Sequence, residues 1–279
     1  EGMLGADLIG FHTRRYRGHF TAALRRLLGI EMKNDAVIYD GRSVRLGYFP
    51  MSVDSAAYAR QGSDRKVLAE ASRMRTENDV CLLGGIDRLD YSKGLPRRLL
   101  AFERLLSTYP EWLERIRLVQ VAVPSREGLA AYQSVRRSVE ELVGRINGRY
   151  GTHRWTPIRY INRSVSDTVL SALYRAADVL LVTPLRDGMN LVAKEFVASR
   201  VDGDGVLVLS EFAGAADELT RALIVNPYDV DGMAESINLA LTMPRAERRD
   251  LRRAMREHVM LHYVAEWSRT VLSALESRV

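Results

Sequence analysis

From residue 80 onward, the hydrophobic positions of this chain fall into short runs separated by longer amphipathic stretches. Six of the runs are apolar and mostly β-branched: Val80–Ile86, Arg117–Val123, Ile158–Ile161, Val179–Thr183, Val206–Leu209 and Ala222–Val225. The intervening stretches have helical spacing, as in Arg97–Tyr109, Glu127–Arg149, Ser166–Ala177 and Asn190–Ala198. Continuous apolar runs are typical of parallel strands buried on both faces. Their alternation with helices predicts an α/β domain with a Rossmann-like parallel sheet and right-handed crossovers.

The N-terminal quarter has a different pattern. Leu4–Phe11 indicates a helix-to-strand step, Val44–Phe49 a strand, and Ser63–Asn78 a charged helix or linker. Residues 1–75 look too few to form a core of their own, so we interpret them as the remnant of an N-terminal domain plus a linker. Because the chain begins with Glu1 and not with Met, we expect a fragment of a longer protein.

The remainder divides into the Rossmann-like domain and a terminal helix. We expect the domain to span residues 76–262. Ala246–Arg278 has the pattern of two helices, and the second of them, over residues 263–279, ends the chain.

Composition and charge are those of an ordinary globular protein. Hydrophobic residues make up 47% of the 279 positions, and no apolar run approaches the roughly 20 residues of a membrane span. The net charge is +6, and 37 of the 41 basic residues are arginines, a bias that looks genomic. The densest basic stretch, Arg245–Arg256, contains acidic and no aromatic residues, so we expect a solvated helix face and neither a nucleic-acid nor a membrane partner. The lone Cys81 cannot form an internal disulfide, which favours a cytoplasmic location.

Polar residues and glycines follow several of the predicted strands. They form the segments Asp87–Gly94, Pro124–Glu127, Pro184–Asn190 and Ser210–Ala215. The carboxyl ends of parallel strands lie on one edge of the sheet, and open α/β sheets bind their ligands beyond that edge. The sequence therefore predicts the functional site there.

Two cations in the first of these segments suit a diphosphate. Arg88 and Lys93 lie five positions apart in a loop that ends with a glycine. A guanidinium fork and an ammonium group can hold a diphosphate and stabilise the charge that develops when it leaves. The alternative is a pair of surface cations, which would be common in a chain this rich in arginine.

The segment after the fourth run predicts an anion pocket. Gly188 permits a tight turn, and Asn190 begins a helix whose first-turn N–H groups, from Gly188 to Val192, would point at the site. Asp187 could accept hydrogen bonds from sugar hydroxyls, and Glu195 from a ribose. The alternative is an Asp-Gly turn with Asn190 as a helix N-cap and Glu195 merely exposed. That alternative does not explain Arg88 and Lys93 on the same edge.

Long motifs resemble the trehalose-6-phosphate synthase family. They are Arg88–Gly94, Gly144–Gly148, Pro184–Glu195, Val208–Ala215 and Leu223–Pro227. The similarity covers essentially the whole chain but only the C-terminal part of the family's sequence. It implies a GT-B fold, in which two Rossmann-like domains face each other across a cleft. It also implies transfer of glucose from a nucleotide diphosphate glucose to glucose 6-phosphate, with retention of configuration.

The resemblance assigns roles to particular residues. It implies that Arg88 and Lys93 act catalytically on the donor diphosphate and that Arg126 reaches the acceptor phosphate. The implied donor-binding set is Arg88, Lys93, Asp187, Gly188, Met189, Asn190, Leu191, Val192 and Glu195. It implies no cofactor and no metal ion, and the five histidines show no metal-binding spacing. The leaving diphosphate would help to deprotonate the incoming hydroxyl.

Several alternatives stay open at this stage. A relative with another phosphorylated acceptor or a pseudo-sugar donor would share these motifs, and so would a non-catalytic regulatory homologue, although such a homologue should lose the donor residues. The donor base, expected near Val123 and Ile158–Asn162, could be that of UDP, GDP or ADP. The partners expected are the donor and the sugar-phosphate acceptor, and a homo-oligomer is compatible with the sequence. The family's acceptor-sugar residues have no counterpart here, so we expect the isolated chain to bind donor without turnover.

Overall fold

The computed structural model describes residues 1–76, 80–126 and 128–277. Its backbone forms two compact units, Ser55–Leu261 and a second made of Glu1–Asp54 with His262–Val279. The sequence placed the divisions instead after residues 75 and 262. Three of the predicted helical stretches extend to positions that lie outside the described residues. These positions are 77, 78, 127, 278 and 279.

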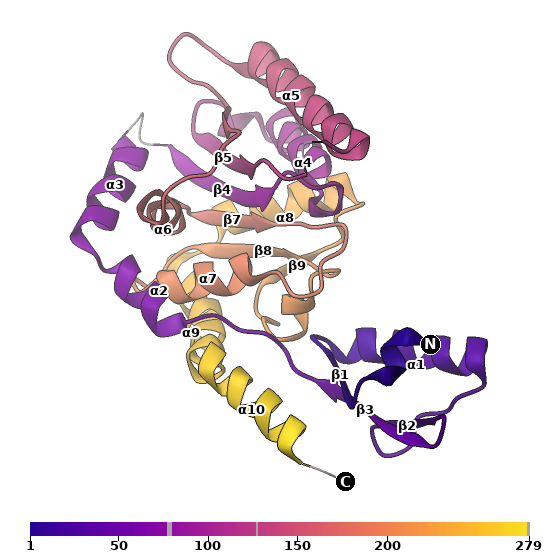
Figure 1. Cartoon of the computed structure of the whole chain (residues 1–279). Helices are drawn as coiled ribbons and strands as arrows, with labels where there is room; N and C mark the ends of the chain where they lie inside the picture. The colour runs from indigo at the N-terminus through magenta and orange to yellow at the C-terminus, as the bar shows by residue number, and fades with distance from the viewer. Residues whose placement is uncertain (77–79, 127, 278–279) are drawn as a thin grey trace. The chain divides into compact units, whose positions relative to one another are not determined.

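The larger unit is built on a parallel sheet with the strand order β6-β5-β4-β7-β8-β9 (Figure 1). The strands are β4 (Cys81–Arg88), β5 (Ile116–Val123), β6 (Ile158–Ile161), β7 (Val179–Val182), β8 (Val206–Ser210) and β9 (Leu223–Val225). Each of the six predicted runs forms one of them, so the predicted Rossmann-like sheet is confirmed. The chain proceeds from β4 towards β6 on one side and from β7 towards β9 on the other. The ends of β4 and β7 therefore flank a topological switch point, where such sheets bind ligands.

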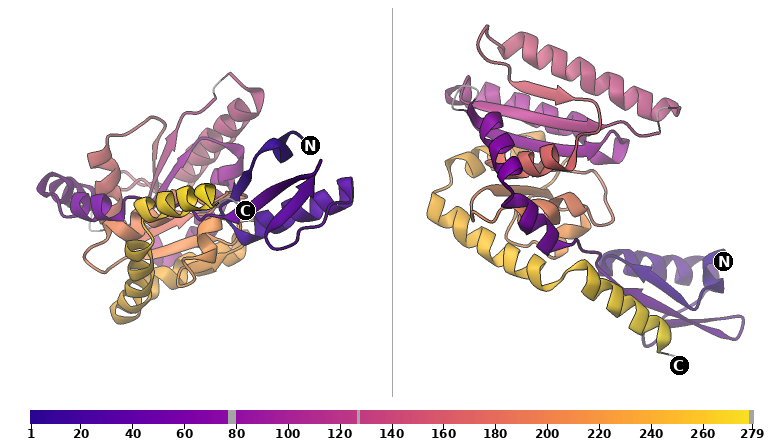
Figure 2. Two further views of the ribbon diagram at one scale, coloured as in Figure 1. Left: turned by 60° about the horizontal axis from the view of Figure 1, so that its bottom comes forward. Right: turned by 60° about the vertical axis from the view of Figure 1, so that its left-hand side comes forward.

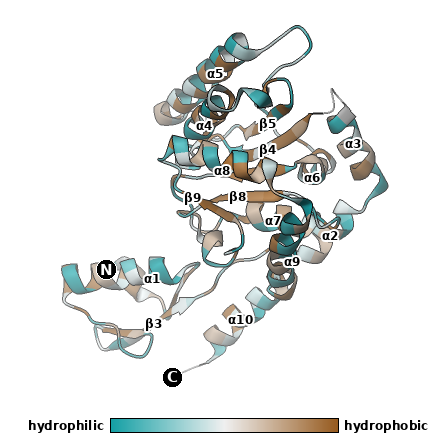
Figure 3. Ribbon diagram, turned by 180° about the vertical axis from the view of Figure 1, so that it is seen from behind, coloured by the Kyte–Doolittle hydropathy of each residue, from teal (hydrophilic) through white to brown (hydrophobic). Residues whose placement is uncertain are grey.

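Helices cover both faces of this sheet (Figure 2). One face carries α4 (Leu95–Thr108), α5 (Ala130–Tyr150) and α8 (Val230–Thr242), and the other carries α6 (Asp167–Ala176) and α7 (Leu191–Ser199). Leu83, Leu99 and Phe102 are among the fully buried side chains of the core on the first face. Figure 3 shows hydrophobic strands between helices of mixed hydropathy, as the two periodicities predict.

Three further helices complete the larger unit. Helix α2 (Ser55–Gly62) packs on α7, α3 (Arg65–Thr76) packs on α6, and α9 (Arg245–Leu261) packs on α7. These contacts explain why residues 55–75, which the sequence assigned to a remnant and linker, belong to the Rossmann-like unit. A short 3-10 helix, η3 (Pro110–Trp112), precedes β5.

The smaller unit contains a three-stranded sheet with the order β1-β3-β2. Its elements are η1 (Gly2–Gly5), β1 (Leu8–Phe11), α1 (Arg14–Leu28), β2 (Ala36–Tyr39), β3 (Arg42–Tyr48) and α10 (Val264–Glu276). A core cluster of buried apolar side chains consists of Leu4, Ile9, Leu24, Val37, Val44 and Leu46. The structure differs here from the expectation that this segment has no core, because α1 packs on β1 and β3 and encloses these side chains.

Helix α10 belongs to the smaller unit through two bonds to the end of its N-terminal segment. The backbone N–H of Val264 donates to the carbonyl of Val53 at 3.1 Å. The indole N–H of Trp267 donates to the carbonyl of Phe49 at 3.2 Å. Helix α10 confirms the helix predicted at the C-terminal end of the chain. The sequence did not predict its hydrogen bonds to Phe49 and Val53.

Candidate active site

The loops that follow β4 and β7 are bonded to each other at the switch point. The backbone N–H groups of Leu185 and Arg186 both donate to the carbonyl of Ser92, at 2.7 and 3.3 Å. Gly94 permits this approach, because its φ is +69° and a Cβ there would lie 2.4 Å from the carbonyl oxygen of Thr183. Most residues that carry a Cβ adopt that conformation only with strain, whereas glycine adopts it freely. Two of the polar segments predicted at this edge of the sheet are thus joined through their backbones.

Lys93 and Asp187, predicted separately, meet across these loops. The Lys93 ammonium lies 2.5 Å from the Asp187 carboxylate, and the two side chains are 13% and 17% exposed. Lys93 is the last residue of the short 3-10 helix η2 (Tyr91–Lys93). The Asp187 carboxylate also accepts a hydrogen bond from the Asn190 side-chain amide at 3.0 Å. An ammonium group has three N–H donors, so this ion pair leaves Lys93 able to donate to a further acceptor.

The start of helix α7 faces the same loops. Asn190 occupies the N-cap position with a φ of 71°, but its side chain bonds to Asp187 and makes no capping bond. The left-handed residue of the turn is therefore Asn190, whereas the sequence had drawn attention to Gly188. The alternative placed Asn190 at the helix N-cap, and the residue does occupy that position, although its side chain makes no capping bond. Helix α7 begins at Leu191, directly after the polar segment that follows β7, so its first-turn N–H groups and the positive end of its dipole lie where an anion can bind.

A second set of backbone bonds fixes this turn from the β8 side. Asp187 donates through its N–H to the carbonyl of Phe212 at 3.1 Å and accepts from the N–H of Gly214 at 3.2 Å. The N–H of Ala215, in η4 (Gly214–Asp217), donates to the carbonyl of Met189 at 2.8 Å. Gly214, in the predicted polar segment Ser210–Ala215, thus contacts Asp187 through its backbone.

Glu195 is held by two tyrosines that sequence reasoning missed. The hydroxyl of Tyr174 in α6 donates to Glu195 at 2.6 Å, and that of Tyr58 in α2 also donates to it. Burial raises the pKa of Glu195, while the two hydroxyl donors oppose that shift. The expected alternative of an exposed Glu195 is therefore wrong. Tyr58 gave no signal in the sequence, because its helix was assigned to a different domain.

Arg88 and Arg126 are both exposed, and both are linked to the buried Asp90. Asp90 accepts from the N–H of Ser92 at 2.9 Å and from the hydroxyl of Tyr132 at 3.1 Å. Burial alone would raise the pKa of Asp90, but these bonds and the charge of Arg88 hold it below its ordinary value. Arg126 donates to the same Tyr132 hydroxyl at 3.3 Å. Tyr132 therefore connects the predicted acceptor arginine to the loop that carries Lys93.

A buried network under these loops also escaped the sequence analysis. Arg98, in the first turn of α4, is 1% exposed and donates to Asp87 at 2.6 Å, to Gln120 at 3.0 Å and to Thr183 at 3.0 Å. Burial raises the pKa of Asp87, and the charge of Arg98 opposes that shift. The network joins the middle of β5, at Gln120, to the ends of β4 and β7. Helical periodicity placed Arg98 on a helix but gave no sign that its partners come from three strands.

Among the described residues, no group of three or more His, Cys, Asp or Glu side chains could hold a metal ion. No helix among them is long and apolar enough to cross a membrane. What the edge of the sheet offers is two cations, a helix N-terminus and two carboxylates, an arrangement that suits a phosphate group carrying hydroxyl-bearing substituents.

Known proteins are similar to this chain in sequence and in fold. The model of Glycosyltransferase family 20 matches residues 1–277. A bifunctional trehalose-6-phosphate synthase/phosphatase of Thermoproteus tenax is 45% identical over 278 residues, which is 99% of this chain. An alpha,alpha-trehalose-phosphate synthase (UDP-forming) of Burkholderia xenovorans, solved in complex with glucose-6-phosphate, is 39% identical with a TM-score of 0.95 over 99% of this chain.

An E. coli structure named for trehalose-6-phosphate and bound with UDP-2-fluoro glucose is 40% identical, with a TM-score of 0.95 over 99% of this chain. The chain spans 38% of the Thermoproteus protein and 62% of each of the two solved chains.

Proposed function

The chain belongs to glycosyltransferase family 20, and from that premise we propose that it is the donor-binding part of a trehalose-6-phosphate synthase. The complete enzyme transfers glucose from UDP-glucose to glucose 6-phosphate with retention of configuration. The observation that carries the proposal is the convergence of Lys93, Asp187 and the start of α7 at the switch point of the sheet. The relatives' names support the reaction, since they are synthases and one is UDP-forming.

The chemistry assigned to the cations concerns the leaving group. As the bond from the glucose to the diphosphate breaks, negative charge develops on the diphosphate oxygens. Lys93, Arg88 and the first-turn N–H groups of α7, over Leu191 and Val192, stabilise that charge in fixed positions, so little reorganisation is needed during the reaction. A divalent ion plays this part in other transferases, and we propose that none is needed here.

The two carboxylates bind the neutral parts of the donor. Asp187 accepts hydrogen bonds from hydroxyls of the glucose, which therefore share that carboxylate with Lys93 and Asn190. Glu195 accepts from the ribose, and its orientation is fixed by Tyr58 and Tyr174. Gly188 and Met189 approach the donor with their backbone.

The acceptor is bound in part by Arg126, whose guanidinium pairs with the phosphate of glucose 6-phosphate. The incoming hydroxyl attacks from the face that the diphosphate leaves, and a diphosphate oxygen takes the hydroxyl proton. This path accounts for retention without an enzymic nucleophile. We propose UDP-glucose as the donor because UDP is the nucleotide named for two of the solved relatives.

Calorimetric titration of the chain with UDP, GDP and ADP tests this proposal. We expect UDP to bind most tightly and Lys93→Ala to weaken UDP binding roughly 10- to 100-fold, the value of one or two charge-assisted hydrogen bonds. Lys66→Ala is the matched control, because Lys66 is an exposed lysine of α3 in the same unit. It should leave the UDP affinity unchanged, and so should EDTA if no metal ion takes part.

Three results would count against the proposal. Tighter binding of GDP or ADP would change the donor assignment. Equal affinity of the Lys93→Ala and Lys66→Ala proteins would remove Lys93 from the site. Absence of synthase activity in a longer protein that contains this chain, despite UDP binding, would favour the non-catalytic homologue.

A further inference from the structure

We propose that a groove along helix α9 binds a small organic phosphate at the edge of the sheet opposite the donor site. The groove has a volume of about 840 Å³, which is within the range of small-molecule sites. It lies between one face of α9 and residues 201–203, the turn that precedes β8. The donor residues lie at or beyond the carboxyl ends of β4 and β7. A parallel strand begins at the edge opposite its carboxyl end, so the two sites are separate.

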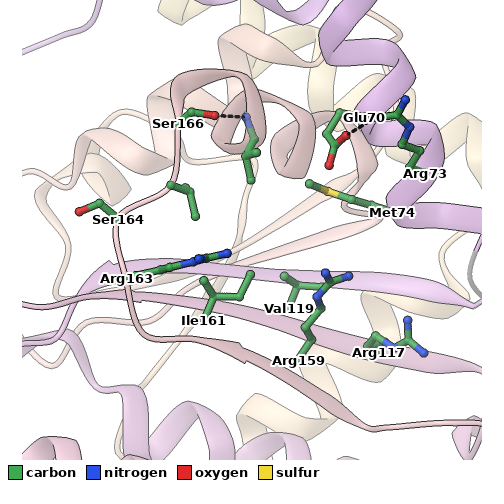
Figure 4. A pocket seen from close by; sticks show the side chains of 12 residues that line it. Glu70, Arg73, Met74, Arg117, Val119, Arg159, Ile161, Arg163, Ser164 and Ser166 are labelled. Carbon is green, nitrogen blue, oxygen red and sulfur yellow. Dashed lines mark hydrogen bonds and ion pairs between the residues drawn. The ribbon is translucent and has the colours of Figure 1, made fainter.

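The groove is also distinct from a cavity on the part of the sheet that the helices leave uncovered. Figure 4 shows that cavity, with Arg159 and Ile161 of β6 among its lining and Arg163 in the loop that follows. It therefore overlaps the segment where the donor base is expected. Among the described residues, the groove on α9 shares no lining residue with it.

The face of α9 in the groove is rich in arginine. The arginines that line it are Arg249, Arg252, Arg253 and Arg256. Their spacing of three and four positions places them on one side of the helix. The carboxylates that line it are Asp202, Asp250 and Glu257.

Two of these three carboxylates already have cationic partners. Asp250 pairs with Arg253 at 2.5 Å. Asp202 pairs with Arg175 at 2.7 Å and with Arg200 at 3.0 Å, and neither of these arginines lines the groove. The described lining thus holds three further guanidinium groups and one further carboxylate, so its unpaired charge is positive.

Arg252 has hydrogen-bond donors that the fold does not use. Its side chain is 1% exposed, and its guanidinium lies 4.8 Å from the centre of the Phe196 ring. Its Nη2 donates to the carbonyls of Phe196, Val197 and Arg200 at the end of α7, at 3.3, 3.0 and 3.5 Å. Its Nε and Nη1 have no hydrogen-bond partner in the described part of the chain, and the same holds for the buried Nε of Arg256. Capping of α7 accounts for Nη2 but not for these donors, which an oxyanion would satisfy.

The charges around Arg252 favour an anion as well. Burial lowers the pKa of Arg252 well below its ordinary value, and the charges of Arg200, Arg256 and Arg175 lower it further, whereas that of Asp202 raises it. A nearby anion would offset this repulsion. A phosphate monoester carries about 1.5 to 2 negative charges at pH 7 and therefore offsets more of it than a carboxylate does.

Apolar side chains at the same groove indicate that the ligand has an organic body. Val201 and Leu261 line it and remain 38% and 68% exposed, and Met260 lies beside them in the lining. A ligand with an apolar group can cover these side chains while its phosphate reaches the arginines.

Calorimetric titration with phenyl phosphate tests the site, because this probe joins a phosphate to an apolar ring. We expect Arg249→Gln and Arg256→Gln each to weaken binding about five- to tenfold through loss of a charge-assisted bond. Arg252→Lys keeps the charge but removes the Nε and Nη1 donors, and it should weaken binding as well. The first two variants carry the test if this buried substitution lowers stability. Arg137→Gln, at an exposed position on α5, is the control with the same change of charge as the two glutamine variants.

Further arms locate the bound probe. Phenyl phosphate should slow amide hydrogen exchange in α9 and in residues 201–203, both in this chain and in the Lys93→Ala protein. A large excess of UDP should not displace it from there. These arms report on the groove whether or not UDP binds.

Several results would overturn the proposal. They are no detectable binding of phenyl phosphate, unchanged affinity in both glutamine variants, an equal loss with Arg137→Gln, absence of protection in α9, and displacement from α9 by UDP. Equal binding of benzoate would overturn the assignment to a phosphate. Equal binding of inorganic phosphate would overturn the contact with an apolar group.

Discussion

The loops after β4 and β7 differ from the segment after β5 in how they are held. The first two are bonded to each other through Ser92, pinned to η4, and supported from below by the buried Arg98 network. Arg126, after β5, has an exposed side chain that joins them through the hydroxyl of Tyr132. The donor-side surface is therefore built into the fold, whereas the arginine assigned to the acceptor phosphate is positioned by a weaker, more exposed contact.

This difference matches the demands of the two proposed roles. Groups that stabilise developing charge act best when they are already in place before the reaction. A cation that captures a phosphate from solvent gains from exposure and tolerates some freedom. The comparison predicts large energetic effects of substitutions in the donor loops and small ones around Arg126.

The largest effect should come from the buried network. Arg98→Met leaves the Asp87 carboxylate buried without its cation, and we expect it to lower the free energy of unfolding by about 3–5 kcal/mol. Urea unfolding measures this loss. The double variant Arg98→Met with Asp87→Asn should recover part of it, because no buried charge remains. A loss below about 1 kcal/mol for Arg98→Met alone would mean that the network does not anchor the loops.

Two glycines allow a matched comparison of the loops themselves. Gly94→Ala forces a side chain into a left-handed conformation against Thr183 and should cost about 2 kcal/mol or more in unfolding free energy. Gly128→Ala, close to Arg126, meets nothing within 4 Å and should change it by less than about 0.5 kcal/mol. Thermal and urea unfolding of both proteins decide the point. Similar losses for both would contradict the proposed difference between the loops.

Tyr132→Phe tests the link between the two regions. The variant removes one hydroxyl that bonds to Asp90 and Arg126, and we expect a loss of about 1 kcal/mol in unfolding free energy. The UDP affinity should stay within about twofold, since the donor loops keep their other supports. A longer protein that contains this chain should show a raised KM for glucose 6-phosphate. A large fall in UDP affinity instead would show that Tyr132 holds the donor site.

The smallest effect concerns the pH dependence of Asp90. Its pKa is lowered in the folded chain, so its ionised form stabilises the fold above the unfolded-state pKa of about 3.9. That contribution is lost as the pH falls from about 4 through the lowered folded-state value. Asp90→Asn keeps a good capping group and should cost less than about 1 kcal/mol at pH 7. The difference in melting temperature between the unsubstituted protein and Asp90→Asn should shrink at pH 3. A difference that grows at pH 3 would contradict the lowered pKa of Asp90.

Much of the fold was predictable because local pattern and burial coincide in it. Strands such as Val179–Val182 are buried on both faces, so their positions read as continuous apolar runs. The edge predicted for the site followed from the same pattern of buried strands, because parallel strands all have their carboxyl ends at one edge of the sheet. The domain boundaries were less accessible, because the placement of α2 and α3 depends on packing against α6 and α7 and not on their own composition.

The sequence by itself determined the parallel sheet, the polar edge beyond its strands and the residue types able to hold a diphosphate there. Only the tertiary structure decided which of those groups touch: Lys93 with Asp187, Glu195 with Tyr58, and Arg126 with Tyr132. It also decided which charges are buried, as for Arg98, and where the sheet stays uncovered. The physical reason is the separation along the chain over which each kind of interaction acts. Periodicity and turn chemistry act between neighbours in the chain, whereas these contacts join residues from 6 positions apart, as in Arg126 and Tyr132, to 137 apart (195 − 58), as in Tyr58 and Glu195.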